Sequence, residues 1–298
     1  MYISAFILLI ISSWNMAFGE RVAICVTGMP ARFQPHHLLS FFESNTDYTF
    51  DLFYRFQEGS DLVYTTTPSA RYEASVFASY DDQTFQSRLV RIYEKFNHVN
   101  VTSIKYTTPK SRQQWLEVVG KFDPISQYAH IQQNILNMFE KADHCAEDVK
   151  KYQEDNAMRF DYIIHTKEDI FLFQKMSLRN LLTKYKDCDW IGKNCLAWGG
   201  LSMRFAIMKP EKGLEFIGSK IKHFKALAQD KKYVYNPEKF DLSIAESLKM
   251  KTCAVPVEEV PATSARHVKN GLFCFIGHEL FNCIPKGQET FADIKRCK

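Results

Sequence analysis

The sequence lacks the short motifs that identify several large enzyme classes. The first predicted strand, residues 21–27, is followed by a single glycine, so there is neither a G-x-G-x-x-G dinucleotide fingerprint nor a Walker phosphate loop. No G-x-S-x-G nucleophile elbow occurs. His278-Glu279 is not followed by the second histidine of a zinc helix, and no C-x-x-C pair is present. These absences argue against dinucleotide, P-loop, serine-hydrolase and zinc chemistry.

Charge of one sign and long apolar runs are also scarce. The net charge is +4 over 298 residues and no basic run is dense enough to follow a nucleic-acid backbone. The first nineteen residues carry no Lys, Arg, Asp or Glu, and their apolar core, residues 5–11, is shorter than the ~20 residues of a membrane helix. With Ala17 and Gly19 as small residues before a cleavage point, residues 1–19 predict a cleaved signal peptide in preference to a signal anchor.

No later segment is apolar enough to span a bilayer. We therefore expect a chain that is secreted or lies in the lumen of the secretory pathway (ER or Golgi), with no stable membrane span after signal cleavage.

Entry into an oxidising compartment changes what the cysteines imply. The chain has eight, all after residue 19: Cys25, Cys145, Cys188, Cys195, Cys253, Cys274, Cys283 and Cys297. An even number in a secreted chain predicts disulfides, and the spacing leaves their pairing open. Cys25 lies inside an apolar strand pattern, which we interpret as a buried thiol. Asn100-Val-Thr102 is an N-glycosylation sequon and predicts a loop at the surface.

Strand and helix patterns alternate along the chain. Strands are predicted over residues 21–27, 48–56, 99–106, 162–164, 189–191 and 203–208, and helices over 36–42, 88–96, 123–139, 177–185, 209–227 and 236–248. Residues 58–87 and 253–298 read as loops, and the charged residues 143–157 are expected to extend or follow the helix over 123–139 in solvent. At 46% hydrophobic residues the chain can form a substantial core. The pattern predicts one α/β domain over residues 20–298 with a largely parallel sheet.

The most informative stretch is residues 160–173. The apolar Tyr162-Ile-Ile164 predicts a buried strand, which ends in the polar run His165-Thr-Lys-Glu-Asp169 before apolar residues resume. Ligands in open α/β sheets bind outside the carboxyl ends of strands. Charges beside a core are usually paired or bind a cation. The stretch therefore predicts a metal or phosphate site, and the alternative is a solvated turn with salt bridges.

Several further segments occur in a suggestive order. They are Val22–Arg32, Gln127–Asn137, Lys167-Glu-Asp169, Trp198-Gly-Gly200 with Arg204–Met208, Asn236-Pro-Glu238 and Arg266–Gly271. In this order, residues 21–271 resemble the nucleotide-sugar-dependent glycosyltransferases of the GT-A fold. Lys167-Glu-Asp169 is similar to a degenerate Asp-x-Asp motif of the Arg-x-Asp type. The resemblance implies a single-domain GT-A-like, Rossmann-type sandwich with a mainly parallel sheet flanked by helices.

The resemblance also implies a function. A sugar would pass from a nucleotide-sugar donor to a hydroxyl of a glycan or glycoprotein acceptor, assisted by Mn²⁺ or Mg²⁺. Asp169 would bind the metal, with Glu168 supporting and His267 as a late ligand, and Glu238 would be the catalytic base. Trp198-Gly-Gly200 would form an acceptor platform. The implied nucleotide-sugar contacts are Thr27, Gly28, Arg32, Lys167, Arg204 and Arg266.

Alternatives stay open at several of these positions. Arg32 and His267 also fit ordinary surface residues, and Glu238 fits a glutamate favoured by the dipole of a first helical turn. Trp198-Gly-Gly200 also fits a plain turn with a core tryptophan. With Lys at 167 and Ile at 170 a strict Asp-x-Asp motif is absent, so an inactive relative fits too. The rival functions are a secreted, non-catalytic carbohydrate- or nucleotide-binding protein on the same fold, and a disulfide-stabilised interaction protein. The sequence leaves the donor, the acceptor, the stereochemical course and the oligomeric state open.

Overall fold

The computed structural model describes most of the chain from residue 19 onward. The described residues are 19–30, 33, 36–58, 82–121, 126–172, 174–195, 197–202, 204–232, 234–267, 272–276 and 281–285. Only the backbone is described at residues 36–37, 82–85, 88, 126–130, 171, 263, 265–267, 272–276 and 281–285. The predicted signal peptide, except for its last residue, and Arg32 lie outside the described residues.

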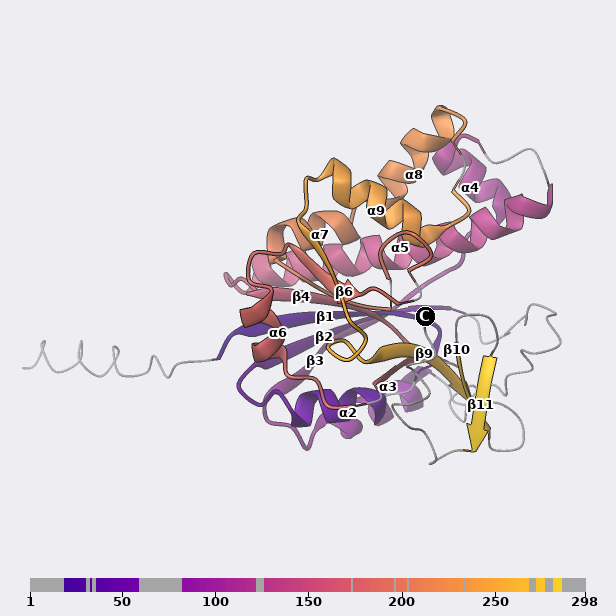
Figure 1. Cartoon of the computed structure of the whole chain (residues 1–298). Coiled ribbons are helices and arrows are strands. Elements are labelled where there is room, and N and C mark those ends of the chain that lie inside the picture. Colours follow the sequence, from indigo (N-terminus) through magenta and orange to yellow (C-terminus); the bar gives the residue numbers. More distant parts are fainter. Residues whose placement is uncertain are drawn as a thin grey trace, which may run out of the picture.

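A seven-stranded sheet forms the centre of the molecule (Figure 1). Its order is β3-β2-β1-β4-β7-β6-β8. The strands are β1 Arg21–Gly28, β2 Thr49–Gln57, β3 Val99–Thr107, β4 Tyr162–Lys167, β6 Trp190–Lys193, β7 Phe205–Met208 and β8 Thr252–Val255. Four neighbouring pairs are parallel, and β7 runs antiparallel to both β4 and β6. The expectation of an α/β fold with a mainly parallel sheet is confirmed.

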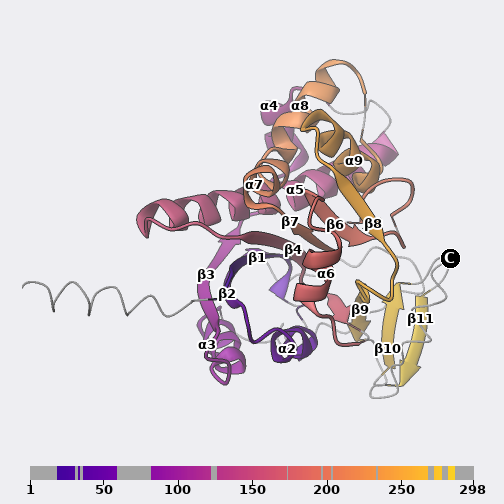
Figure 2. The same cartoon turned by 60° about the vertical axis from the view of Figure 1, so that its left-hand side comes forward.

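Helices cover both faces of this sheet (Figures 1 and 2). One face carries α2 His36–Glu43, α3 Asp82–Tyr93 and α6 Leu178–Lys184. The other carries α4 Arg112–Val119, α5 Ser126–Asp155, α7 Pro210–Ile217, α8 Lys220–Gln229 and α9 Pro237–Ser247. Each face therefore has its own hydrophobic core, as a parallel sheet buried on both sides requires.

Strand β1 shows why its sequence is a continuous apolar run. Val22, Ile24 and Val26 enter the core beneath α2 and α3, whereas Ala23 and Cys25 enter the core beneath α5. The side chains alternate between faces, so a strand buried on both sides needs apolar residues at every position.

Cys25 is not the free thiol that this pattern suggested, because it forms a disulfide with Cys145 of α5. A second disulfide joins Cys188 to Cys253, and Cys195 is disulfide-bonded as well. The apolar strand pattern around Cys25 could not reveal a partner 120 residues away.

Two helix predictions were partly wrong. Residues 143–155 do extend the preceding helix, as part of α5, but Cys145, Ala146 and Val149 within this charged segment are fully buried rather than solvated. The helix expected over residues 209–227 is two helices, α7 and α8, separated near Gly218. A Cβ on Gly218 would lie 2.9 Å from the Cβ of Ala146, so the close approach of α7 to α5 leaves no room for a side chain there.

The region expected to be loops after residue 253 contains a second sheet. Its order is β11-β10-β9-β5, with β5 Ile170–Leu172, β9 Ala262–His267, β10 Leu272–Ile276 and β11 Phe281–Pro285. Strand β9 runs antiparallel to β5, with Ile170 opposite Ser264. The late-chain strand therefore lies directly beside the segment that follows Asp169.

Two surface features complete the fold. Asn100 of the sequon is exposed as expected, but it lies on strand β3 rather than in a loop, and its amide donates to Asp51 at 3.4 Å. Among the described helices, none combines the length and apolar character that crossing a membrane requires.

Candidate functional site

The acidic pair lies where β1 and β4 end side by side. Thr27 of β1 is level with Lys167 of β4, and the backbone N–H of Glu168 donates to the carbonyl of Thr27 at 3.1 Å. Gly28 follows with a φ of +155°, and a Cβ on it would lie 2.0 Å from both Cδ and Oε2 of Glu168. Glycine is therefore needed at the last position of β1 so that the Glu168 carboxyl can lie against the backbone.

Both carboxylates are buried. Glu168 is 5% exposed and Asp169 is 2% exposed, so the solvated-turn alternative is wrong. They act together on Lys167, which closes β4. Burial and then the charge of Arg204 lower the pKa of Lys167, while Asp169, Glu238 and Glu168 each raise it. Because such effects require proximity, these five charged groups form one cluster.

Arg204 enters this cluster from the start of β7. Thr166 lies opposite Phe205, and the Thr166 hydroxyl donates to the carbonyl of Arg204 at 2.9 Å. The guanidinium carbon of Arg204 lies 5.0 Å from the centre of the Trp198 ring, within reach of a cation–π interaction. Arg204 is 5% exposed, so its charge is largely shielded from water.

Glu238 joins the cluster from the first turn of α9. Asn236 caps this helix by accepting from the N–H of Lys239 at 2.9 Å, and Pro237 follows it. Glu238 is 7% exposed. Burial raises the pKa of Glu238, and Lys167 and Arg204 partly offset this by lowering it. The interaction of a first-turn glutamate with the helix dipole does not explain why Glu238 is buried beside two cations.

The Trp198-Gly-Gly200 turn is fixed to the same helix end. A Cβ on Gly200 would lie 2.0 Å from the carbonyl oxygen of Glu238, and the N–H of Leu201 donates to that oxygen at 2.9 Å. The amide of Asn236 donates to the carbonyl of Trp198 at 3.2 Å. Trp198 has a φ of +40° and is 45% exposed. The turn thus holds a large aromatic side chain in a strained conformation at the edge of the cluster.

Further polar groups lie beside the cluster: His165 belongs to the polar run of residues 165–169 that the sequence singled out, whereas the sequence did not point to Lys220 or Asp241. The ring of His165 lies 3.2 Å from the hydroxyl of Thr27. Burial first, and then the charges of Lys220 and Lys167, lower the pKa of His165 to about 3, so its imidazole is neutral at pH 7. Lys220 forms a buried ion pair with Asp241 of α9. Lys220 could not be recognised from the sequence, because it is one of several lysines in its helix and its partner, Asp241, lies 21 residues further along the chain.

The predicted site residues divide into two groups. The structure brings seven of them to one sheet edge: Thr27, Gly28, Lys167, Glu168, Asp169, Arg204 and Glu238. Arg32 lies outside the described residues. Arg266 and His267 lie on β9, and their side chains are not described. Sequence reasoning missed Lys193, the fully buried last residue of β6.

Glu168 and Asp169 are the described residues that fit a metal ion. Among the described residues, no group of three or more His, Cys, Asp and Glu side chains is arranged to hold one. Mg²⁺ is commonly bound by one or two carboxylates together with substrate phosphates and waters, and Mn²⁺ prefers the same oxygen ligands. Two adjacent buried carboxylates fit a cation shared between protein and substrate, rather than a closed protein cage.

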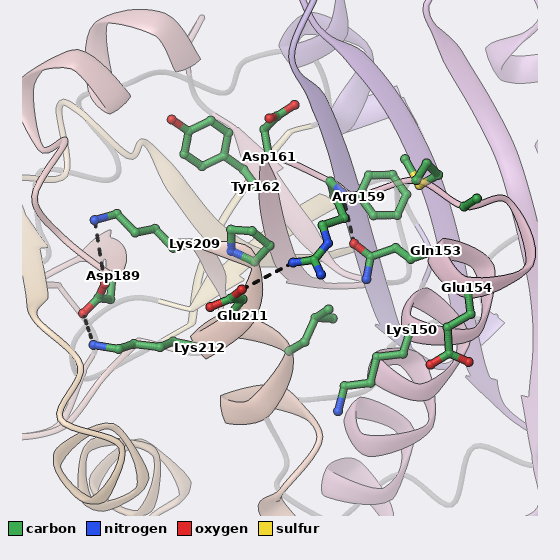
Figure 3. Close-up of a pocket in the computed structure, with 15 residues that line it drawn as sticks. Lys150, Gln153, Glu154, Arg159, Asp161, Tyr162, Asp189, Lys209, Glu211 and Lys212 are labelled. Atoms are coloured by element: carbon green, nitrogen blue, oxygen red, sulfur yellow. Dashed lines mark hydrogen bonds and ion pairs between the residues drawn. The ribbon is translucent and has the colours of Figure 1, made fainter.

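A groove of about 930 Å³ lies at the opposite edge of the sheet, between the end of α5 and the start of α7 (Figure 3). Its lining includes Tyr162, the first residue of β4, and two separate ion pairs. Asp189 contacts Lys212 at 2.8 Å, and Arg159 contacts Glu211 at 3.5 Å. The groove is at the amino end of β4, and ligands in such sheets bind at the carboxyl ends, so we assign the site to the charged cluster.

The chain was compared with known proteins. No protein-family profile and no curated protein sequence matches it. Among solved structures, mouse xyloside xylosyltransferase 1 matches with a TM-score of 0.40 and 10% identity over 80% of this chain and 86% of that one.

Two further matches are to longer proteins. The bifunctional glycosyltransferase WbbM has a TM-score of 0.42 and 8% identity, and the match covers 82% of this chain and 40% of WbbM. The glycosyltransferase GlyE of Streptococcus pneumoniae has a TM-score of 0.38 and 12% identity, covering 81% of this chain and 46% of GlyE. All three proteins are glycosyltransferases. Because the TM-scores and identities are low, we argue function from the site residues.

Proposed function

We propose that this chain is a glycosyltransferase that moves a sugar from a nucleotide-sugar donor to a hydroxyl of a glycan or glycoprotein acceptor, assisted by Mn²⁺ or Mg²⁺. The observation that carries the proposal is the buried charge cluster at the carboxyl edge of the sheet. Glu168, Asp169, Arg204 and Glu238 are each at most 7% exposed. Burying this many charges is costly for a fold, and such clusters occur preferentially at functional sites.

The cations of the cluster suit the donor. When the bond between sugar and diphosphate breaks, negative charge grows on the leaving phosphate. Lys167 and Arg204 supply positive charge in a largely water-excluded place, where it stabilises that oxyanion more than it would in water. A divalent cation, held by Asp169 with Glu168, would add Lewis-acid neutralisation of the same charge.

Glu238 and Trp198 suit the acceptor. Burial raises the pKa of Glu238, which makes its carboxylate a stronger base for a proton from an attacking hydroxyl. Trp198, held next to Glu238 through Gly200 and Leu201, offers an exposed aromatic face on which a sugar ring can stack. In this proposal the two residues would bind the acceptor beside the donor phosphate.

A non-catalytic binding protein is the second candidate. It is favoured by the absence of a strict Asp-x-Asp motif, because Lys167 takes the first acidic position and leaves Asp169 as the motif's one acid. It would use the same cations for a nucleotide or glycan without turnover. An interaction protein with no such site is disfavoured, because the acidic pair is buried rather than solvated. The disulfides are compatible with a secretory-pathway location for either candidate.

The deciding experiment uses the purified chain with a panel of UDP- and GDP-sugars, in Mn²⁺ or in EDTA. Nucleotide release reports turnover, and thermal shift reports binding. A glycosyltransferase is expected to bind one donor in Mn²⁺ and to release its nucleotide when an acceptor is present. Binding without release across an acceptor panel would favour the binding protein. An absence of binding to every donor would refute both candidates.

Asp169→Asn tests the metal assignment within the same assay. Loss of the carboxylate charge should abolish the Mn²⁺-dependent part of the stabilisation by donor. Asp155→Asn is the matched control, because Asp155 is exposed at the end of α5 and pairs only with Lys151 four residues earlier among the described residues. If Asp169→Asn kept the Mn²⁺-dependent shift, Asp169 would not be a metal ligand.

A further inference from the structure

Lys193 closes strand β6 in an unusual environment for a lysine. The strand pairs with β8, with Lys193 opposite Val255, and with β7, with Gly192 opposite Ala206. Lys193 therefore lies beside the start of β7, where Arg204 enters. Its side chain is 0% exposed, and in the part of the chain that the structure describes its Nζ has no hydrogen-bond partner.

The fold gains nothing from this lysine. A buried ammonium without a partner costs several kcal/mol, and an apolar side chain of similar length would fill the same space without that cost. Burial lowers the pKa of Lys193 well below its usual value, and the nearby charge of Arg204 lowers it further. Among the described residues, no carboxylate raises it. A residue that destabilises its own fold in this way is expected at a functional site.

The β6–β7 connection supplies a second polar group in the same condition. Ser202 is 1% exposed, and within the described chain its hydroxyl has no hydrogen-bond partner. It lies two residues before Arg204 and four after Trp198. The β6–β7 connection therefore begins after Lys193, contains the hydroxyl of Ser202 and ends at the guanidinium of Arg204. All three can donate hydrogen bonds, and the two cations favour a group with negative charge.

We propose that Lys193, Ser202 and Arg204 form an oxyanion subsite that binds a phosphate or carboxylate group of a substrate. The inference rests on the proposed function and deepens it, because it adds the buried Lys193 and Ser202 to Arg204, which the proposed function already assigns to the donor. The anion is either the diphosphate of the donor or the carboxylate of an acidic sugar. An oxyanion there would offset the repulsion between Lys193 and Arg204. It would also accept hydrogen bonds from the Lys193 ammonium and the Ser202 hydroxyl.

The test compares Lys193→Met and Ser202→Ala with the unmodified chain. Calorimetric titration with pyrophosphate, UDP and glucuronate gives affinities, and thermal unfolding without anion gives stability. Lys193→Met is expected to unfold at the same or a higher temperature, because it replaces a buried charge with an apolar side chain of similar length. It should weaken binding of at least one of the three anions about tenfold or more. Ser202→Ala should weaken binding of the same anion by a smaller factor.

Lys212→Met is the matched control. Lys212 lies at the opposite edge of the sheet and pairs with Asp189, so its loss changes the net charge equally without touching the subsite. The probes identify the source of the anion. A loss confined to pyrophosphate and UDP would assign the subsite to the donor diphosphate, and a loss confined to glucuronate would assign it to an acidic sugar.

Unchanged affinity of Lys193→Met and Ser202→Ala for all three probes would overturn the inference. So would an unmodified chain that binds none of them. If Lys193→Met lowered the unfolding temperature without changing any affinity, Lys193 would be structural. These results are distinct from failure of the proposed function, in which the unmodified chain neither binds nor turns over any sugar nucleotide.

Discussion

Gly28 connects the backbone of β1 to the acidic pair, so its replacement by alanine tests the geometry of the site. Its φ of +155° is unfavourable for any residue with a Cβ. The new Cβ would also lie 2.0 Å from Cδ and 2.6 Å from Cγ of Glu168. The backbone strain costs about 1–3 kcal/mol and the overpacking about 1–3 kcal/mol, so Gly28→Ala should destabilise the fold by about 2–6 kcal/mol.

Gly120→Ala separates the two costs. Gly120 ends α4 with a φ of +81°, and a Cβ there would meet no heavy atom within 4 Å. This variant should show the backbone cost alone. Combining Gly28→Ala with Glu168→Ala removes the clashing carboxyl, and the pair should show a coupling free energy of about 1–3 kcal/mol in the stabilising direction.

Guanidinium chloride unfolding measures all four variants, and thermal shift with the preferred donor measures binding. Gly28→Ala is also expected to reduce stabilisation by donor, because Glu168 must move. Two results would refute the reasoning. In one, Gly28→Ala costs no more than Gly120→Ala. In the other, the double variant shows no coupling, which would mean that the Glu168 side chain does not lie against Gly28.

Three further predictions concern stability, pH and the acceptor. Replacing Cys25 and Cys145 by serine opens a disulfide that links positions 120 residues apart, and guanidinium unfolding should show a loss of about 2–5 kcal/mol. Burial raises the pKa of Asp143 to about 7. Between about pH 4 and pH 7 the folded state therefore holds a proton on this carboxyl that the unfolded state has released. As pH rises through this range, the carboxyl lowers the free energy of unfolding. Burial lowers the pKa of His165 to about 3, so this residue has the opposite effect and raises the free energy of unfolding as pH rises from about 3 to 6.5. The His165 contribution is the same in Asp143→Asn as in the unmodified chain. Asp143→Asn should therefore flatten the decline relative to the unmodified chain, and identical pH curves would contradict this. Trp198→Ala, at a side chain 45% exposed, should raise the acceptor KM several-fold while changing unfolding by less than about 1 kcal/mol, and an unchanged KM would remove it from the acceptor position.

The sequence predicted the elements whose signal is local. A continuous apolar run such as residues 21–27 can be satisfied only by a strand buried on both faces, and such strands belong to parallel sheets covered by helices. The polar run that closes residues 162–164 then marked the carboxyl edge of that sheet as the site. Asn236-Pro237 marked the start of α9 in the same way, since capping chemistry acts within one turn. These signals depend on neighbours only a few residues away.

The tertiary structure alone decided which of these local features meet. Arg204 and Glu238 join Lys167 only because β7 inserts antiparallel beside β4 and α9 returns to the same edge. Cys145 lies in a segment that reads as a solvated helix, and its burial appears only when α5 packs on β1. Lys193 reads as an ordinary lysine after a short apolar strand, and only β7 and β8 on either side bury it. Burial and pairing depend on contacts between distant segments, whereas periodicity records only the preferences of adjacent residues, so the charge cluster could be located from the sequence but not assembled from it.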